Sequence, residues 1–170
     1  MEVAGALQQT VWLAAVLCVP GMLILWFPDP ILALSTIEPA VEEKLRLYLR
    51  IIACGMPAAL LYRTFYSFCN ALRQPRPLMV ISLANTLLHL GLAWSLVTGV
   101  FTEPLGALGC GLSNMAVNWV GCGLAALWVA KSPALARFRP FADWQAPRWA
   151  TMRELLRLGL PMGFSNFVEI

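Results

Sequence analysis

Long apolar runs separated by short charged segments are the feature that most limits what this chain can fold into. Five runs can be marked, and they cover residues 3–27, 44–72, 77–101, 105–130 and 149–170. The hydrocarbon core of a bilayer is about 30 Å thick and needs roughly 20 helical residues to cross, so the first four runs are long enough. Backbone groups in lipid must be hydrogen-bonded within their own segment, which favours helices over isolated strands. We therefore predict an all-α, polytopic transmembrane helix bundle with about four full spans and the start of a fifth.

The composition supports a membrane environment. Of the 170 residues, 59% are hydrophobic and 12% are charged, whereas a soluble domain carries roughly 25% charged residues. The net charge of +3 comes from short basic loops and not from a Lys/Arg stripe with interleaved aromatic residues, so the expected partner is the lipid bilayer and not nucleic acid. The motifs HExxH, GxSxG and the phosphate-binding loop are absent from the sequence, so we expect neither an enzyme nor a bound cofactor.

The basic residues alternate along the chain as a multi-pass protein requires. Residues 28–43 are acidic, and the segment between the third and fourth runs has no Lys or Arg. The other two connections are basic and contain Arg73 and Arg76 in one case, and Lys131, Arg137, Arg139, Arg148 and Arg153 in the other. Loops rich in Lys and Arg stay in the cytoplasm. We therefore predict that these two connections and the N-terminus face the cytoplasm.

Glycine and proline interrupt the apolar runs. Small residues let helices approach closely in lipid, and the fourth run has five glycines, Gly106, Gly109, Gly111, Gly121 and Gly123. We predict that they serve close packing. Pro20, Pro57 and Pro161 lie inside other runs, where a missing backbone hydrogen bond bends a helix. Such bends occur in transporters that rock between states, although membrane helices also tolerate proline without a functional reason.

An acidic residue lies deep in the last run. Glu169 is expected near mid-depth, where an ionisable group costs about 2.5–3.5 kcal/mol, and Asn166 precedes it on the same helical face. A carboxylate beside an amide can coordinate Na⁺ or take up a proton. We predict a cation- or proton-coupling site at Glu169, with Asn166 as a weaker candidate and Na⁺ as its metal ion. The alternative is a protonated carboxyl group that hydrogen-bonds to another helix.

Four further polar residues within the runs are candidates for lining a cavity. Arg63 and Tyr66 belong to the second run. Arg63 either extends toward the cytoplasmic interface or pairs with an acid on another helix. Asn85 and His89 are one helical turn apart in the third run and share a face. His89 serves either in packing or in proton transfer.

Two pairs of amide side chains are expected to link helices. Asn114 and Asn118 share a face of the fourth run, and Gln8 and Gln9 lie near the start of the first. Amide side chains in membrane helices form hydrogen bonds across to neighbouring helices. We therefore predict interhelical hydrogen bonds from both pairs.

Three motifs follow one another along the chain, YSFCNALRQPRP, LGALGCG and the closing LRLGLPMGFSNFVEI. Together they resemble the bacterial multidrug and toxic compound extrusion (MATE) transporters, in particular the NorM-type branch. The first is similar to the family pattern R-x-F-x-x-G-x-x-x-x-x-P, with Tyr66 at the arginine and Ala71 at the glycine. The last is similar to L-x-L-G-x-P-x-x-x-x-x-x-x-E. His89 and Ala93 stand at the two asparagines of the family sequence N-I-P-L-N.

This resemblance implies an architecture and an activity. The five runs would correspond to helices three to seven of a twelve-helix, two-lobed transporter in a bacterial inner membrane. Residues 1–148 would belong to the amino-terminal lobe, and residues 149–170 would begin the first helix of the carboxy-terminal lobe. The family exports cationic drug-like substrates in exchange for Na⁺ or H⁺ by alternating access. Its coupling glutamate in the seventh helix matches Glu169.

We accordingly interpret the chain as a fragment of a multidrug/cation antiporter, with no cofactor besides the coupling ion, and do not expect it to transport alone. Two other functions stay open. A flippase of the same superfamily would move lipid-linked precursors, but such flippases line their cavities with more cationic residues. A non-transporting membrane scaffold would leave Glu169 with a packing role only.

Overall fold

The regular structure of this chain is helical throughout the part that the computed structural model describes, residues 3–32, 38–74, 76–100, 103–132 and 146–168. The helices are α1 (Val3–Trp26), α2 (Asp29–Leu32), α3 (Pro39–Ala71), α4 (Arg76–Thr98), α5 (Ala107–Lys131) and α7 (Trp149–Val168). Four of them, α1, α3, α4 and α5, are long and apolar enough to cross a membrane. The predicted fold class, an all-α bundle with four full spans, is confirmed.

Helix α3 begins before the apolar run that predicted it. Pro39 occupies its first turn, where the missing N–H leaves no hydrogen bond unmade, and Glu38 before it is extended. Arg46 then donates to Glu42, one turn earlier, over 3.1 and 2.7 Å, and also pairs with Asp29. These ion pairs support helix among charged residues, so apolarity alone placed the start of α3 too late.

The short helix α2 lies where only an acidic loop was expected. The amide of Leu32 donates to the carbonyl of Pro28 over 2.9 Å, which closes a single helical turn. The side chain of Leu32 is buried. The chain directly after α1 is therefore helical, with a buried side chain at Leu32 and an ion pair from Asp29 to Arg46 on α3.

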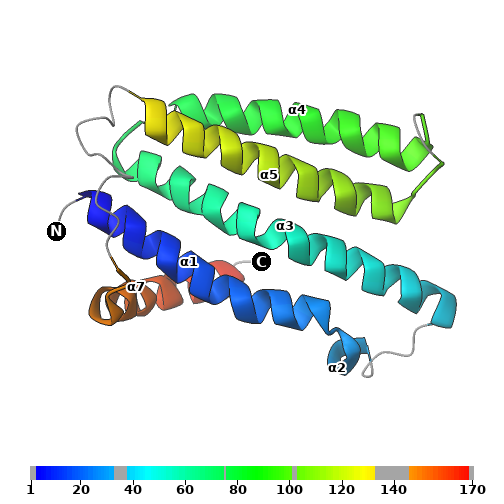
Figure 1. Ribbon diagram of the computed structural model, residues 1–170, viewed down its shortest axis with the longest axis horizontal. Helices are drawn as coiled ribbons and strands as arrows, with labels where there is room; N and C mark the ends of the chain where they lie inside the picture. The colour runs from blue at the N-terminus through cyan, green and yellow to red at the C-terminus, as the bar shows by residue number, and fades with distance from the viewer. Residues whose placement is uncertain (1–2, 33–37, 75, 101–102, 133–145, 169–170) are drawn as a thin grey trace.

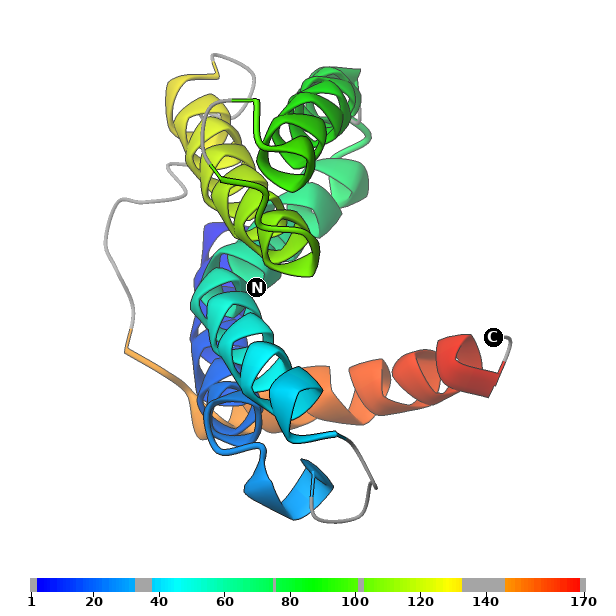
Figure 2. The same cartoon turned by 90° about the vertical axis from the view of Figure 1, so that its right-hand side faces the viewer.

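The four long helices run side by side with alternating direction (Figure 1). Helix α3 lies in the middle, because it packs against α1 on one side and α5 on the other, while α4 packs against α5. Helix α7 contacts α1 and runs across the bundle, so that its C-terminal end lies away from the other helices (Figure 2). The alternating directions agree with a multi-pass chain. The side of the membrane that each connection faces stays a prediction.

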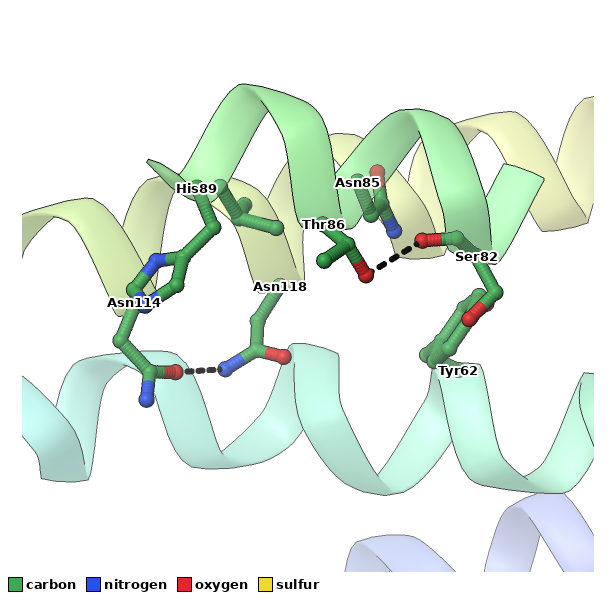
Figure 3. A pocket seen from close by; sticks show the side chains of 8 residues that line it. Tyr62, Ser82, Asn85, Thr86, His89, Asn114 and Asn118 are labelled. Carbon is green, nitrogen blue, oxygen red and sulfur yellow. Dashed lines mark hydrogen bonds between the residues drawn. The ribbon is translucent and has the colours of Figure 1, made fainter. Parts of the chain in front are cut away.

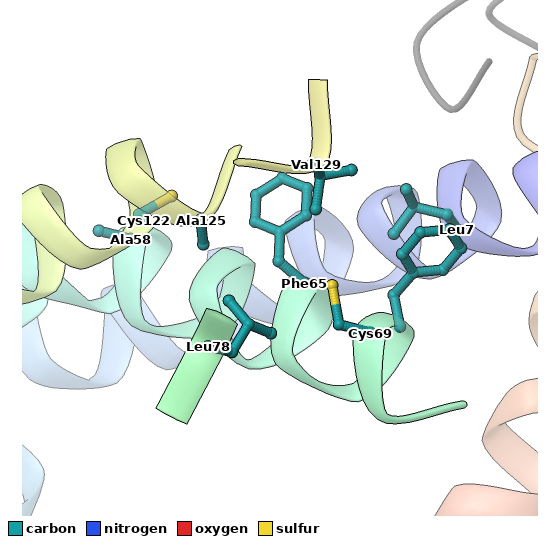
Figure 4. Close-up of a cluster of buried hydrophobic side chains, with 9 residues drawn as sticks. Leu7, Ala58, Phe65, Cys69, Leu78, Cys122, Ala125 and Val129 are labelled. Atoms are coloured by element: carbon teal, nitrogen blue, oxygen red, sulfur yellow. The ribbon is translucent and has the colours of Figure 1, made fainter. Parts of the chain in front are cut away.

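Buried apolar side chains gather toward one end of the bundle (Figure 4). The start of α1, the end of α3, the start of α4 and the end of α5 meet there, and the cluster consists of Leu7, Ala58, Phe65, Phe68, Cys69, Leu78, Cys122, Ala125 and Val129. The two connections predicted to be cytoplasmic leave from this same end. The best-packed part of the molecule is therefore next to the predicted cytoplasmic face.

Glycines of α5 allow its close contacts with α3 and α4. A Cβ placed on Gly111 would lie 2.9 Å from the ring of Tyr48 on α3. One placed on Gly109 would lie 2.9 Å from the backbone of Leu96 on α4, and one on Gly121 would collide with the amide of Asn85. The predicted packing role is confirmed for these three glycines. It is not found for Gly106 and Gly123, where a Cβ would meet nothing within 4 Å among the described residues.

The helices continue through their prolines, since α1, α3 and α7 contain Pro20, Pro57 and Pro161 as interior residues. On α3, the turn before Pro57 accepts a hydrogen bond from outside: the indole Nε1–H of Trp119 on α5 donates to the carbonyl oxygen of Cys54 over 3.1 Å. A proline weakens the backbone hydrogen bonding around it. The indole thus supplies a donor next to the weakened turn and ties α5 to α3.

One face of α4 is exposed and apolar. Met79, Leu83, Leu87, Leu90 and Trp94 recur at intervals of three or four residues, which is one helical stripe, and Val80 lies beside Met79. Val80 is 68% exposed, which is unfavourable in water and favourable against acyl chains. This face of α4 is therefore suited to contact lipid or further helices.

The contact at Gly109 gives a matched pair of substitutions. We expect Gly109→Ala to destabilise the bundle by about 1–3 kcal/mol, because the added methyl group meets backbone that cannot rotate away. Gly123→Ala adds the same methyl group in open space, and the better helix propensity of alanine should stabilise it by up to about 1 kcal/mol. Loss of helical circular dichroism during denaturant titration of the chain in micelles measures both. Equal effects of the two substitutions would contradict the packing assignment.

Candidate functional site

A polar pocket lies between three of the membrane-capable helices, α3, α4 and α5 (Figure 3). It has a volume of about 250 Å³ and is lined by Tyr62, Ser82, Asn85, Thr86, His89, Asn114, Val117 and Asn118. Seven of these eight side chains can form hydrogen bonds. None of the eight is an acid, a lysine or an arginine. The pocket therefore offers polar atoms between membrane-capable helices, and its eight lining residues carry no fixed charge.

The α4 wall of the pocket is a polar stripe on a different side of the helix from the lipid-suited one. Ser82, Asn85, Thr86 and His89 are spaced by three or four residues, so they share one helical face. Asn85 is 9% exposed, and its amide lies against Gly121, where only a glycine leaves room. Asn85 and His89 were predicted from the sequence, whereas Ser82 and Thr86 were not, although their spacing on the same helix indicates the same face.

The predicted residues of α3 lie elsewhere. Arg63 is exposed and Tyr66 packs against the buried cluster, and neither lines the pocket. The wall on α3 comes instead from Tyr62, whose ring centroid lies 6.4 Å from that of Tyr66. Within the described residues the Tyr62 hydroxyl is buried and has no hydrogen-bond partner. A buried hydroxyl without a partner is costly, so Tyr62 supplies an unused donor at the edge of the pocket.

The two asparagines of α5 hydrogen-bond along their own helix. The Nδ2 atom of Asn118 donates to Oδ1 of Asn114 over 2.6 Å (Figure 3). The prediction that this pair bonds between helices is therefore wrong. The bond uses one oxygen and one N–H, which leaves the carbonyl oxygen of Asn118 and the NH₂ group of Asn114 as further polar atoms in the pocket lining.

His89 is connected to α5 through a hydroxyl group. Its Nδ1 atom lies 3.3 Å from Oγ of Ser113, a residue that is fully buried. The same hydroxyl donates to the carbonyl oxygen of Cys110 over 2.9 Å. The imidazole is thus held at one nitrogen while its ring lines the pocket.

A second polar contact holds the start of α7. Gln9 of α1 is 2% exposed. Its side chain both donates to and accepts from the backbone of the segment that precedes α7. Its Nε2–H donates to the carbonyl oxygen of Ala146 over 3.0 Å, and the amide of Arg148 donates to its Oε1 over 2.8 Å. Gln9 was predicted to bond to another helix. Its partners lie instead in the connection that precedes α7.

The structure describes the backbone of one of the two predicted coupling residues. Glu169 is outside the described residues, and Asn166 lies within α7. The polar pocket is formed by α3, α4 and α5, and α7 contributes no residue to its lining. Among the described residues there is also no group of three or more His, Cys, Asp or Glu side chains that could hold a metal ion. The coupling site at Glu169 and Asn166 therefore stays a prediction, separate from the pocket.

Comparison with known proteins agrees with this architecture. The MatE family matches residues 2–95, which is more than half of the chain. The chain belongs to this family. Over 169 residues it is 48% identical to a probable multidrug resistance protein NorM of Aromatoleum aromaticum. It is also 34% identical to the multidrug resistance protein PmpM of Pseudomonas aeruginosa and 33% identical to the multidrug resistance protein NorM of Aliivibrio fischeri.

These relatives are considerably longer than this chain. The matches cover 99% of this chain but 36% of the Aromatoleum protein, and 95% of this chain but 34% of the Pseudomonas protein. The chain thus spans about a third of the length of the curated relatives that it matches. The predicted NorM-type MATE family is confirmed, and the four membrane-capable helices make it an integral multi-pass membrane protein.

The bonds of Gln9 can be tested by hydrogen exchange. Gln9→Met keeps the size of the side chain and removes both bonds, so we expect the Arg148 amide to exchange at least about tenfold faster, which corresponds to about 1.4 kcal/mol. Gln9→Glu keeps an oxygen that accepts from Arg148, so most of the protection should remain. Mass spectrometry of the labelled chain in micelles measures both variants. Unchanged exchange in Gln9→Met would contradict the role of Gln9.

Proposed function

We propose that this chain forms part of the amino-terminal lobe of an antiporter that exports cationic xenobiotics in exchange for Na⁺ or H⁺ by alternating access. Membership of the MatE family supports the proposal, as do the multidrug resistance names of its relatives. The bacterial inner membrane is the proposed location. The observation that carries the proposal is the uncharged polar pocket between α3, α4 and α5.

The chemistry of this pocket suits an organic cation. Carbonyl, hydroxyl and imidazole groups can replace part of the hydration shell of a cation, and no fixed positive charge in the lining repels it. The aromatic ring of Tyr62 adds a face that attracts cations. A pocket of about 250 Å³ is smaller than a typical drug-sized site, so this pocket would hold part of a substrate, with the remainder in contact with other helices.

The lining also bears on the two alternative functions. A flippase for lipid-linked precursors handles a phosphate group, for which arginine is the preferred partner, and the eight lining residues contain none. A scaffold without transport activity has no use for the buried Tyr62 hydroxyl, which lacks a hydrogen-bond partner among the described residues and whose burial costs free energy. Both features favour the antiporter over these alternatives.

The coupling step is proposed to take place at Glu169 and Asn166. Glu169 would bind Na⁺ or a proton, with Asn166 as a supporting ligand, because a carboxylate in lipid requires a compensating charge. Residues 1–148 would form the amino-terminal lobe and residues 149–170 would begin the second lobe. The course of α7 across the bundle, away from α3, α4 and α5, supports this division (Figure 2).

A chimera tests the antiporter function. We expect a protein in which this chain replaces the matching segment of the 48% identical Aromatoleum relative to export a cationic dye such as ethidium, since the spans and the pocket should pack with the remainder of that relative. The measurement is ethidium efflux from energised cells that lack other pumps. The same relative with the segment deleted is the control. No efflux from a chimera that reaches the membrane at the level of the parent would count against the proposal.

Two glutamates of the α7 region separate coupling from general effects. In the chimera we expect Glu169→Gln to abolish ion-driven efflux, because the neutral amide can neither bind nor release the coupling ion. Glu154→Gln makes the same change at an exposed position early in α7 and should leave efflux intact. Efflux driven by a Na⁺ or pH gradient in membrane vesicles measures both variants. Coupled efflux in Glu169→Gln would remove Glu169 from the mechanism.

A further inference from the structure

The environment of His89 determines which of its two ring nitrogens faces the pocket. The Ser113 hydroxyl lies 3.3 Å from Nδ1 of His89 and 2.9 Å from the carbonyl oxygen of Cys110. A hydroxyl group carries one proton. The shorter contact uses that proton, because the carbonyl oxygen can only accept. Oγ of Ser113 therefore acts as an acceptor toward His89, and Nδ1 must carry the hydrogen.

The other nitrogen is left as an acceptor. A neutral imidazole with hydrogen on Nδ1 has a bare lone pair on Nε2. His89 lines the pocket together with Asn114 and Asn118 (Figure 3). The lining contains one other titratable group, the phenol of Tyr62 on α3, and no charged side chain from α3, α4 or α5. The thiol of Cys110 on α5 belongs to a separate groove near the start of that helix.

We propose that Ser113 holds His89 as its Nδ1–H tautomer, so that Nε2 faces the pocket and accepts either a proton or a hydrogen bond from an N–H group of an organic cation, but not both. The inference rests on the proposed function and assigns a regulatory role within the same site. Protonation of Nε2 removes the acceptor and places a positive charge in an otherwise uncharged pocket. The bound cation and the bound proton therefore exclude each other. By linkage, each lowers the binding affinity of the other by the same factor.

His89 can be observed directly because it is the one histidine of the chain. Histidine labelled with ¹⁵N gives a single imidazole spectrum from the whole chain in nanodiscs, and the two nitrogen shifts identify the tautomer. At about pH 8, where an ordinary imidazole is neutral, we expect hydrogen on Nδ1 and a bare Nε2. Ser113→Ala removes the acceptor and should give a mixture of tautomers. Hydrogen on Nε2 in the unaltered chain, or no change in Ser113→Ala, would overturn the proposal.

Binding of ethidium, a cation with N–H donors, tests the competition. We expect it to perturb the chemical shift of Nε2 at about pH 8 and to bind at least about fivefold more weakly at about pH 5, where an ordinary imidazole is protonated. His89→Asn keeps an acceptor that does not titrate, so its binding should not depend on pH. Equal binding by the unaltered chain at both pH values would overturn the competition and leave the antiporter proposal standing.

The remaining outcomes are also decisive. Retained pH dependence in His89→Asn would assign the titration to another group and overturn the role of His89. Failure of ethidium to bind at either pH would overturn the acceptor role of Nε2 toward cations, whereas the efflux of the chimera decides the antiporter function separately. The tautomer measured on the unaltered chain does not depend on the folding of any variant.

Discussion

The close contact between α3 and α5 is the interaction on which the other helices depend. In lipid there is no hydrophobic gain from bringing two apolar helices together, so contact must come from van der Waals packing and hydrogen bonds. Gly111 admits the ring of Tyr48, Gly55 admits the backbone of Met115, and Trp119 donates to the α3 backbone. Helix α1 then packs on the other side of α3, and α4 packs on α5. The contact between α3 and α5 is the largest one between α1 and α3 on one side and α4 and α5 on the other.

The same packing produces the polar pocket. Because Gly121 leaves room for the buried amide of Asn85, α4 can turn its polar stripe toward α5 and its apolar stripe outward. Helix α3 supplies Tyr62 as the third wall. The glycines therefore have two effects: they hold the helices together, and they bring the polar residues of three helices to one place. The site is a consequence of the packing and needs no separate scaffold.

The sequence predicted the fold more completely than the site. Run length and hydropathy identified all four spans, because the lipid environment imposes helices of a minimum length. The start of α3 was misplaced, since ion pairs of Arg46 extend the helix beyond the apolar run. On α4 the spacing of Asn85 and His89 was sufficient to place them on one face. On α5 the same spacing allowed a bond within the helix or across it, and only the packing distinguishes these two cases. Tyr62 and Tyr66 are one turn apart on α3. Only the way in which α4 and α5 pack against α3 decides that Tyr62, and not Tyr66, lines the pocket.

The bonds of Gln9 have a consequence for how the connection before α7 can change over evolutionary time. Both bonds go to main-chain atoms, the carbonyl of Ala146 and the amide of Arg148. Substitution of either side chain would leave these atoms in place, provided that residue 148 is not replaced by proline, which has no amide hydrogen. The requirement for a particular side chain therefore falls on α1 alone. The side chains of the connection can therefore change while Gln9 keeps it hydrogen-bonded to the bundle.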